Sequence, residues 1–429
     1  STGNITMNDN DSIGMYVEEG RGINSGTVAM NGAASAPTKS VVGMVAEAQA
    51  GKTAVAENAS GGIITAGANL GMYIGGLGAS SGINAGTITA ATGTGVYVDG
   101  STNSFNGTGG TITSNTVGIY LKNTGAGKIT AGTLNIASGG VGVFGENANI
   151  DFAVNVAGTG AVGVAAKGTS VVSGNITTGQ DSVGVYVLDN SVSFNGANIT
   201  TGTNSVNSSI GILLNSAVGT YAMSNVTVSA QDGVGIYLDG TTPGINLTHN
   251  GTVNTAGGIG IYVDNGTTLT TGTTVLNING GTGVYVDGGT ANLGTVGSLT
   301  FNFLAGGGIG VFNNGGTMNL GANITVTGSG SLAAATNGSL SSSGNLSIGE
   351  GATGLMGLYD GGLTAAHSVN NSGTITAVSG GIGLAAIKGG TNPAFPVTIN
   401  NIGTINASGV STTSTPSIGI YTDVADVVN

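Results

Sequence analysis

Three aspartates, Asp239, Asp264 and Asp287, recur at nearly equal intervals and are the first candidates for chemistry in this chain. If the segments that carry them stack, their carboxylates lie close together. Carboxylates in pairs can act as general acid and base, and several together can bind Ca²⁺. Each aspartate precedes Gly or Asn, however, which is ordinary turn chemistry, and the glycine-rich nonapeptide that binds Ca²⁺ is missing. We therefore predict no metal site, and a cation shared by the three aspartates is the alternative.

Catalysis of the kind found in polysaccharide-degrading β-helices needs an acid cluster, or acids with Lys or Arg around a metal. The single arginine, Arg21, is remote in sequence from the three aspartates, which lack a nearby basic residue. His249 and His367 have no acid cluster nearby, so we expect both to be ordinary surface or turn residues. Gly258-Ile259-Gly260 resembles a dinucleotide motif only superficially, because no helix follows it. We predict no catalytic residue, no cofactor and no enzyme activity, with a polysaccharide-degrading β-helix as the less favoured alternative.

Aromatic residues also follow a spacing that could bind a ligand. Ten of the eleven tyrosines and two phenylalanines occupy one place in a recurring phrase; they are Tyr16, Tyr73, Tyr97, Tyr120, Phe144, Tyr186, Tyr237, Tyr262, Tyr285, Phe312, Tyr359 and Tyr421. Stacked in space, they would form a ladder, with each ring lying along the next and covering a small Gly, worth about 0.5–1.5 kcal/mol per pair. We favour this structural interpretation over a stripe for sugars or a partner protein. If the stripe binds, the candidate residues are Tyr237, Tyr262 and Tyr285.

The recurring phrase is a Gly followed by a branched residue, a Tyr, another branched residue and an Asp or Asn turn. We take its Gly as position zero, at Gly14, Gly43, Gly71, Gly95, Gly118, Gly142, Gly163, Gly184, Gly211, Gly235, Gly260, Gly283, Gly310, Gly330, Gly357, Gly383 and Gly419. Most steps are about 20 to 29 residues, a period that indicates a solenoid or stacked array.

The phrase alternates with period two, which favours a strand and excludes a helix. In Ile259-Gly260-Ile261-Tyr262-Val263 the branched residues should share the inner face, so that Gly260 and Tyr262 share the outer one. We predict an all-β fold, a right-handed parallel β-helix of about 16–17 coils, with like residues stacked roughly 4.8 Å apart and an apolar inner column as the core.

A second signature, exemplified by Ile23-Asn24-Ser25-Gly26-Thr27-Val28, lies between copies of the first and predicts another strand of each coil. It returns at 83–88, 109–112, 250–253, 371–375 and 402–405. Val192-Ser193-Phe194 and Leu299-Thr300-Phe301 indicate a third short strand. We therefore expect two to three strands per coil.

Charge occupies the place four residues after the Gly and alternates in sign through Asp99, Lys122, Glu146 and Lys167, then Asp189 one place late. Stacked neighbours favour opposite charges, although exposed pairs contribute only about 0–1 kcal/mol each. This alternation supports the proposed register independently of the tyrosines.

Composition restricts the class of protein. The chain has 429 residues, including 85 Gly and no Cys, a formal charge of −12 and 6% charged residues. Hydrophobic residues reach 39%, which argues against disorder. The few basic residues are scattered, so nucleic acid is not an expected partner.

No linker divides the sequence, so we predict residues 1–429 to be one continuous segment of a longer β-helix. Candidate loops that leave the coil are Asn31 to Ser40, Thr203 to Ser209, Ser339 to Gly351 and Gly389 to Pro396. The last contains two of the five prolines and Phe395, which makes 389–396 a candidate protruding loop and Phe395 a candidate ligand contact.

The phrases GVGIYLDG, GIGIYVDNG and GTGVYVDGG, interleaved with NSGTITA and NIGTINASG, resemble the passenger region of giant type V autotransporter adhesins of fusobacteria. The likeness covers essentially the whole chain but is a style of repeat, and no binding residue can be carried over from it. It implies a passenger exported through a C-terminal β-barrel that is not part of this sequence, with location at the outer surface of a bacterium.

The resemblance and the acidic, Lys-poor repeats lead to an expected function. We expect a segment of a cell-surface adhesin that attaches to host cells or other bacteria. The resemblance implies host glycans such as galactose or N-acetylgalactosamine, or host receptors, as partners. A purely structural spacer or a self-associating stalk is the main alternative.

Overall fold

The computed structural model describes residues 3–32, 41–203, 209–215, 218–241, 243–304, 307–321, 324–326, 328, 330–359, 366–388, 395–408 and 416–429. The chain divides into two compact units, Ser1–Ile212 and Leu213–Asn429. In each unit parallel strands stack into a β-solenoid, and the two together contain about 15 turns. The described residues include no helix. The predicted all-β parallel solenoid is confirmed, with slightly fewer coils than expected; its right-handed winding and the single continuous domain stay predictions.

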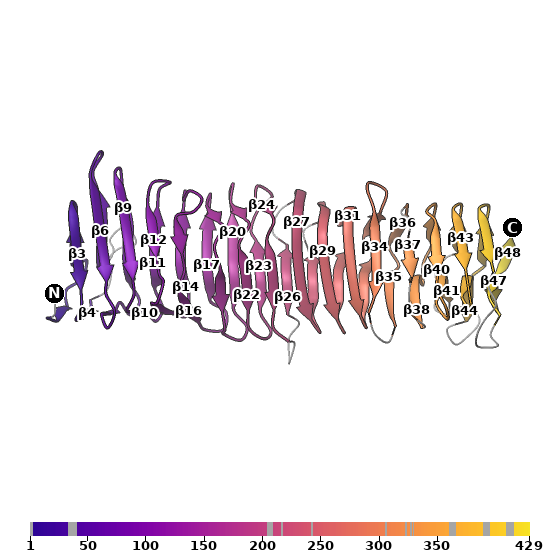
Figure 1. Ribbon diagram of the computed structural model, residues 1–429, viewed down its shortest axis with the longest axis horizontal. Helices are drawn as coiled ribbons and strands as arrows, with labels where there is room; N and C mark the ends of the chain where they lie inside the picture. The colour runs from indigo at the N-terminus through magenta and orange to yellow at the C-terminus, as the bar shows by residue number, and fades with distance from the viewer. Residues whose placement is uncertain are drawn as a thin grey trace. The chain divides into compact units, whose positions relative to one another are not determined.

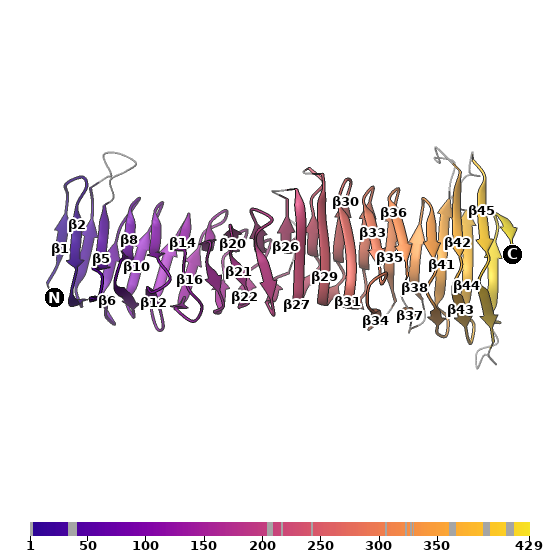
Figure 2. The same ribbon diagram turned by 90° about the horizontal axis from the view of Figure 1, so that it is seen from above.

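Most coils contribute three strands, at the upper end of the predicted range (Figures 1 and 2). The glycine–tyrosine strands contain the first phrase. In unit 1 they are β2 (Ile13–Val17), β5 (Val42–Ala48), β8 (Leu70–Gly76), β11 (Thr94–Asp99), β14 (Val117–Lys122), β17 (Val141–Glu146), β20 (Val162–Lys167) and β23 (Val183–Val187). In unit 2 they are β28 (Val234–Leu238), β30 (Ile259–Asp264), β32 (Thr282–Asp287), β35 (Gly308–Asn314), β38 (Ser331–Thr336), β41 (Thr353–Tyr359), β44 (Ile382–Lys388) and β47 (Ile418–Thr422). A further such strand, β26 (Ile210–Leu214), contains the boundary between the units.

The threonine strands contain the second phrase and face the glycine–tyrosine strands across the core. In unit 1 they are β1 (Ile5–Met7), β4 (Thr27–Met30), β7 (Ile63–Thr65), β10 (Thr87–Ala90), β13 (Thr111–Ser114), β16 (Thr133–Ile136), β19 (Val154–Val156), β22 (Asn175–Thr178) and β25 (Asn198–Thr201). In unit 2 they include β34 (Leu299–Phe303), β37 (Ile324–Val326), β40 (Leu346–Ile348), β43 (Thr374–Ala377) and β46 (Thr404–Ala407).

Middle strands connect the other two in each coil. In unit 1 they are β3 (Gly20–Asn24), β6 (Thr53–Asn58), β9 (Ala79–Asn84), β12 (Ser104–Asn106), β15 (Ile129–Thr130), β18 (Asn149–Ile150), β21 (Val171–Val172) and β24 (Ser193–Asn195). In unit 2 they are β33 (Thr290–Leu293), β36 (Thr317–Leu320), β39 (Leu340–Ser342), β42 (His367–Asn371), β45 (Val397–Asn401) and β48 (Asp426–Val428). In three coils of unit 2 the middle and threonine strands are continuous, forming β27 (Gly219–Gln231), β29 (Ile245–Ala256) and β31 (Thr268–Asn279).

Like residues lie over like residues, as the sequence predicts. In unit 1, Tyr97 pairs with Tyr120 and Asp99 pairs with Lys122 in the ladder between β11 and β14. In the threonine strands, Ile88 pairs with Ile112, and both are fully buried. Burying one such branched side chain contributes roughly 1.5–3 kcal/mol, so the repeated inner columns account for much of the stability.

The expected division of faces around the Gly is wrong. The ladder between β28 and β30 pairs Val234 with Ile259 and then Ile236 with Ile261, so it skips the glycine. A Cβ on Gly235 would lie 2.4 Å from the carbonyl oxygen of Gly260 and 2.8 Å from the buried Val253. The Gly therefore faces the core beside the branched residue that follows it, and does not share the outer face with Tyr. The branched residue before it is only half-buried.

Four further predictions about individual segments are wrong. The column position assigned to Gly330 belongs to Ala333, and that assigned to Gly357 belongs to Gly354, because Val311 pairs with Ala334 and Ala334 pairs with Leu355. Leu299–Phe303 is a threonine strand and not an additional middle strand, since Phe301 pairs with Leu276. The candidate loop from Ser339 to Gly351 contains β39 and β40, so it stays within the coil. The two column errors arise because the repeat is shifted by three residues in these coils.

Most of the other three candidate loops falls outside the described residues. Residues 33–40, 204–208 and 389–394 are not described, whereas Phe395 and Pro396 are.

Candidate binding surface

The outer face of the glycine–tyrosine strands in unit 1 carries a stack of four rings. Tyr73, Tyr97, Tyr120 and Phe144 have successive ring centroids 5.6, 4.9 and 4.9 Å apart, with interplanar angles of 20°, 16° and 22°. The stack ends where Phe144 pairs with Ala165. The predicted ladder is therefore present, and its rings are half-buried.

A second stack in unit 2 brings together three of the predicted ligand contacts. Tyr262, Tyr285 and Phe312 are stacked, with centroids 5.3 and 5.4 Å apart, and Tyr237 meets Tyr262 edge-on at 87° with 5.0 Å between centroids. Phe312 pairs with Ala335, which ends the stack. Phe395, the fourth predicted contact, lies beyond β44, far along the chain from this stack, and is 41% exposed. Whether any of the four binds a ligand stays a prediction.

Stacking restricts what these rings can bind. Because each ring covers the face of the next, mainly ring edges and hydroxyl groups reach the surface. A sugar that stacks flat on an aromatic face would need a ring at the end of a stack. At the end formed by Phe144, the Nζ atom of Lys167 lies over the ring at 5.6 Å from its centroid.

Tyr359 does not belong to the aromatic column, contrary to the prediction. It is fully buried, pairs with Lys388, and donates its hydroxyl proton to the carbonyl oxygen of Gly338 at 3.3 Å. Its ring stacks on His367 at 6.2 Å. Met356 takes the column place in this coil. The column is nevertheless correct at Tyr421, which pairs with Ala385 and is 43% exposed.

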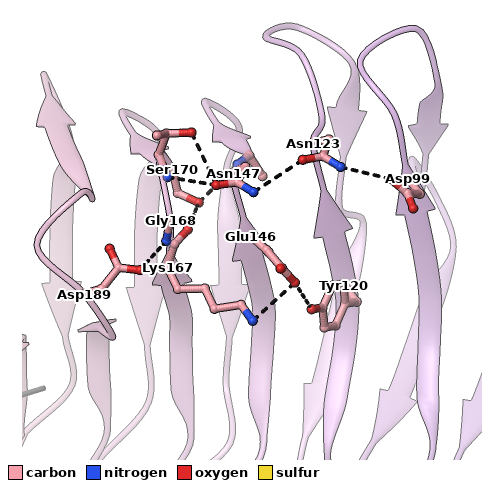
Figure 3. A network of polar contacts seen from close by, with 11 residues as sticks. Asp99, Tyr120, Asn123, Glu146, Asn147, Lys167, Gly168, Ser170 and Asp189 are labelled. Atoms are coloured by element: carbon pink, nitrogen blue, oxygen red, sulfur yellow. Dashed lines mark hydrogen bonds and ion pairs between the residues drawn. The ribbon is translucent and has the colours of Figure 1, made fainter.

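Acidic and basic side chains link successive coils beside the first stack (Figure 3). Glu146 accepts a hydrogen bond from Tyr120 and forms an ion pair with Lys167 at 3.3 Å. The hydrogen bond from Tyr120 is the main cause that lowers the pKa of Glu146 below its usual value, and Lys167 and Lys122 add to it. The alternating charges are thus neighbours, as the sequence predicts.

Amide groups and two aspartates extend this network along the turns (Figure 3). Asn147 donates to Asn123, and Asn123 donates to Asp99, both at 3.4 Å. Asp189 accepts a hydrogen bond at 2.6 Å from the backbone N–H of Gly168. These contacts fix the spacing of successive coils and leave the carboxylates engaged with donors of the chain itself.

The three recurring aspartates, Asp239, Asp264 and Asp287, accept hydrogen bonds from the chain. Asp287 accepts from the Tyr262 hydroxyl at 2.7 Å and from Asn314 at 2.9 Å. Asp264 accepts from the backbone N–H of Gly240 at 3.1 Å, and Asp239 accepts from that of Thr241 at 2.9 Å. Donors from the same coil and from neighbouring coils thus engage all three carboxylates. Within the described residues, no group of three His, Asp or Glu side chains is arranged to hold a metal.

Buried asparagine ladders are a feature that the sequence analysis missed. Asn24 donates to Asn58 and Asn58 donates to Asn84, each at 2.8 Å, and all three side chains are fully buried. Asn58 also donates to the carbonyl oxygen of Gly62 at 3.2 Å. The recurring Asn at the end of the middle strand, in Ile23-Asn24 and Ile83-Asn84, is the signal that could have revealed this ladder.

Two grooves also went unpredicted. The groove in unit 1 has a volume of about 500 Å³ and runs beside the first aromatic stack, between Tyr97, Tyr120, Leu70 and Val117. Its remaining lining includes threonines, and among the described residues that line it none is charged.

The groove in unit 2 has a volume of about 370 Å³ and lies along an outward row of polar side chains, Asn319, Ser341, Asn370 and Asn400. Asn400 donates to Asn370 at 2.8 Å, and Asn370 donates to the hydroxyl oxygen of Ser341 at 3.4 Å. Ile402, which is 84% exposed, forms an apolar wall. Both grooves offer uncharged hydrogen-bonding groups next to apolar surface.

His249 was expected to be a surface or turn residue, and this prediction is wrong. It lies within β29 and is fully buried. His367 is half-buried in β42 against Tyr359. Alternation along β29 places His249 inward together with Leu247. This alternation is the sequence signal that could have predicted the burial of His249.

In comparisons with models of known protein families, with characterised proteins and with solved structures, none matches this chain significantly. Among the described residues, no helix has the length and apolar character needed to cross a lipid bilayer.

Proposed function

We propose that this chain is a segment of an adhesin on the surface of a bacterium, and that it attaches to host cells or to other bacteria. The observation that carries the proposal is the aromatic column on the outer face of the solenoid, with an uncharged groove directly beside Tyr97 and Tyr120. Tyrosine edges and threonines suit a partner that has both hydroxyl groups and apolar faces. Host glycans and host receptors are the proposed partners.

A solenoid is a suitable scaffold for such a surface. The ladders of hydrogen bonds and rings hold the outward side chains at fixed intervals. Because these side chains are already ordered, the protein loses little conformational entropy when a partner binds. The acidic chain, with a net charge of −12, would remain soluble at the cell surface and would repel nucleic acid and anionic membranes.

The function is testable with labelled protein of the full chain, applied to host cells, to other bacteria and to immobilised glycans. A lysine in place of Thr94 would enter the groove in unit 1. The matched control is T113K, because Thr113 points outward from the threonine strand β13. We expect T94K to reduce cell binding at least tenfold and T113K to leave it unchanged. Competition by free galactose or N-acetylgalactosamine would assign the partner to glycans.

A structural spacer is the second candidate, and one observation favours it. Much of the polar surface is used internally, as in the row Asn254, Asn277 and Asn302, where each amide donates to the one before it at 2.7 and 2.8 Å. If no cell, bacterium or glycan binds the protein, or if T94K and T113K bind equally well, the adhesive role of this surface is refuted and the spacer remains. Sedimentation would then show whether the spacer self-associates.

We also propose that the chain has no enzymatic activity, because Asp239, Asp264 and Asp287 all accept hydrogen bonds from the chain itself. Incubation with neutral and acidic polysaccharides, with and without Ca²⁺, tests this proposal. Turnover that is lost in the D264N variant would overturn it.

A further inference from the structure

A histidine lies in the core of unit 2, among neutral neighbours. His249 is fully buried, and it pairs with Met223 in the coil before it and with Thr271 in the coil after it. Both pairings end at irregularities in the ladder, between Met223 and Val226 and between His249 and Gly251. The imidazole thus lies where the middle and threonine strands of three successive coils bend together.

The hydrogen bonds of Thr274 determine which nitrogen of the imidazole carries the proton. The hydroxyl of Thr274 donates its only proton to the carbonyl oxygen of His249 at 2.8 Å. The hydroxyl oxygen of Thr274 also lies 3.2 Å from Nδ1 of His249. Because its proton is already donated, this oxygen can only accept a hydrogen bond from Nδ1. Nδ1 therefore carries the proton, and Nε2 presents a lone pair to the core.

The Nε2 atom is buried and has no hydrogen-bond partner among the described residues. A proton added at Nε2 would create a cation with an N–H group that has no acceptor. An unpaired charge in the interior is among the most costly groups that a fold can contain.

The residues that face His249 from the neighbouring strands carry no negative charge that could compensate for such a cation. On the packed strands β27 and β31, Tyr221 is the titratable residue that faces inward, and it is neutral at physiological pH. Across the core, β28 and β30 present Leu238 and Val263 inward. The outward residues of those strands, Tyr237, Tyr262 and Asp264, lie on the opposite side of the sheet.

We propose that His249 is an acid-sensitive switch, and that its protonation opens the coils formed by β27, β29 and β31 while the other coils of unit 2 remain folded. The device would change the spacing of the outer side chains that these coils carry, including Tyr237 and Tyr262. The inference does not depend on the proposed adhesive function, since it concerns the stability of the coils alone.

The direction of the effect follows from burial, which lowers the pKa of His249 from 6.5 to about 4. The open coil therefore binds a proton more readily than the closed coil. Stability is complete above pH 6.5, falls as the pH decreases towards 4, and then becomes constant. At pH 4.5 the equilibrium constant for opening should be on the order of 50- to 100-fold higher than at pH 7.

Hydrogen exchange resolved by residue, on the full chain, measures this opening. The amides of Val253 and Leu276 report the coils in question, and exchange rates corrected for the intrinsic effect of pH give the opening equilibrium. In the variant H249M the new side chain is of the same type as Met223, which pairs with His249 in the preceding coil. The variant should fold, because methionine has nearly the same volume as histidine. We expect wild-type protection to fall 50- to 100-fold between pH 7 and pH 4.5, beyond the change in H249M.

The variant H367Q is the matched control, because it removes the other histidine and should retain the acid response of the wild type. Nitrogen chemical shifts of the imidazole provide a readout that does not depend on any variant. They should show an Nδ1–H tautomer at pH 7 and no titration above pH 5. An imidazole that titrates near pH 6.5, or equal acid dependence in wild type and H249M, would overturn the proposal.

Discussion

Tyr262 donates its hydroxyl proton to Asp287, one coil further along unit 2, with 2.7 Å between the two oxygen atoms. The same relationship joins Tyr120 to Glu146 in unit 1, and Tyr16 to Glu47 at 3.2 Å. In each case a ring two places after the column Gly reaches the carboxylate four places after the next one. The aromatic and charged columns are therefore one connected structure, in which burial and the acidic partner raise the pKa of Tyr262.

This relationship predicts unequal effects of removing two tyrosine hydroxyls. We expect Y262F to lower the free energy of unfolding by about 1 kcal/mol, because a partly exposed hydrogen bond to a carboxylate is lost while the ring stack remains. Y237F should change it by less than about 0.5 kcal/mol, because no hydrogen bond of its hydroxyl is seen among the described residues. Denaturation by urea measures both values. Equal losses in the two variants would show that the hydroxyl contact contributes nothing.

Alkaline pH should weaken the first aromatic stack. Burial is the main cause that raises the pKa of Tyr97 to about 12, and the carboxylate of Asp99 adds to it. Because the folded value exceeds the unfolded value of 10, stability from the neutral phenol is complete below pH 10 and is lost as the pH rises through 12. Ultraviolet absorbance of phenolate, compared between wild type and Y97F, measures this ionisation. A residue that ionises near pH 10 would contradict the half-buried position of the ring.

Periodicity in the sequence was sufficient to predict the fold and the pairing of most columns. Tyr97 over Tyr120 and Asp99 over Lys122 follow directly from a repeat in which every coil has nearly the same length. The period failed where a copy lacks its distinguishing residue. In β38 the column place is Ala333, so the sequence offered Gly330 instead, and the error continued to Gly357 and Tyr359.

Features that depend on the third dimension could not be predicted in the same way. A strict alternation of faces assumes a regular pleat, and the pleat is interrupted at the column Gly, where two successive residues face inward. Both grooves are lined by short runs of residues from several successive coils, so their shape depends on how those coils stack. Alternation along β29 places His249 inward together with Leu247, but the irregularity that follows His249 in the ladder had no signal in the local sequence.

The buried asparagine ladder predicts a large loss of stability from a small change. N58A should lower the free energy of unfolding of unit 1 by about 3 kcal/mol, because amide groups of Asn24 and Asn84 and nearby carbonyl oxygens lose their partner in the core. The matched control is N302A, which removes an exposed member of another ladder and should cost less than about 0.5 kcal/mol. Thermal unfolding detects the difference. A mild effect of N58A would mean that water replaces the missing amide.

The column Gly predicts a contrast between two identical substitutions in unit 2. A Cβ on Gly260 would lie 2.4 Å from the carbonyl oxygen of Gly283, which is part of the backbone of the next coil and cannot move alone. A Cβ on Gly419 would meet only the side chain of Ile405, at an ordinary distance of 3.6 Å. We therefore expect G260A to cost about 2 kcal/mol by overpacking, and G419A to cost less than about 0.5 kcal/mol.

Hydrogen exchange of the strands that flank each position separates these two outcomes, because it reports local opening. Protection in β30 and β32 should fall in G260A, and protection in β44 and β47 should be unchanged in G419A. Ala333 already occupies the same column, so the backbone can shift to accept a methyl group where the neighbouring coils allow it. If G260A proves as harmless as G419A, that adjustment is general, and close approach of the backbone is not the reason that Gly fills this column.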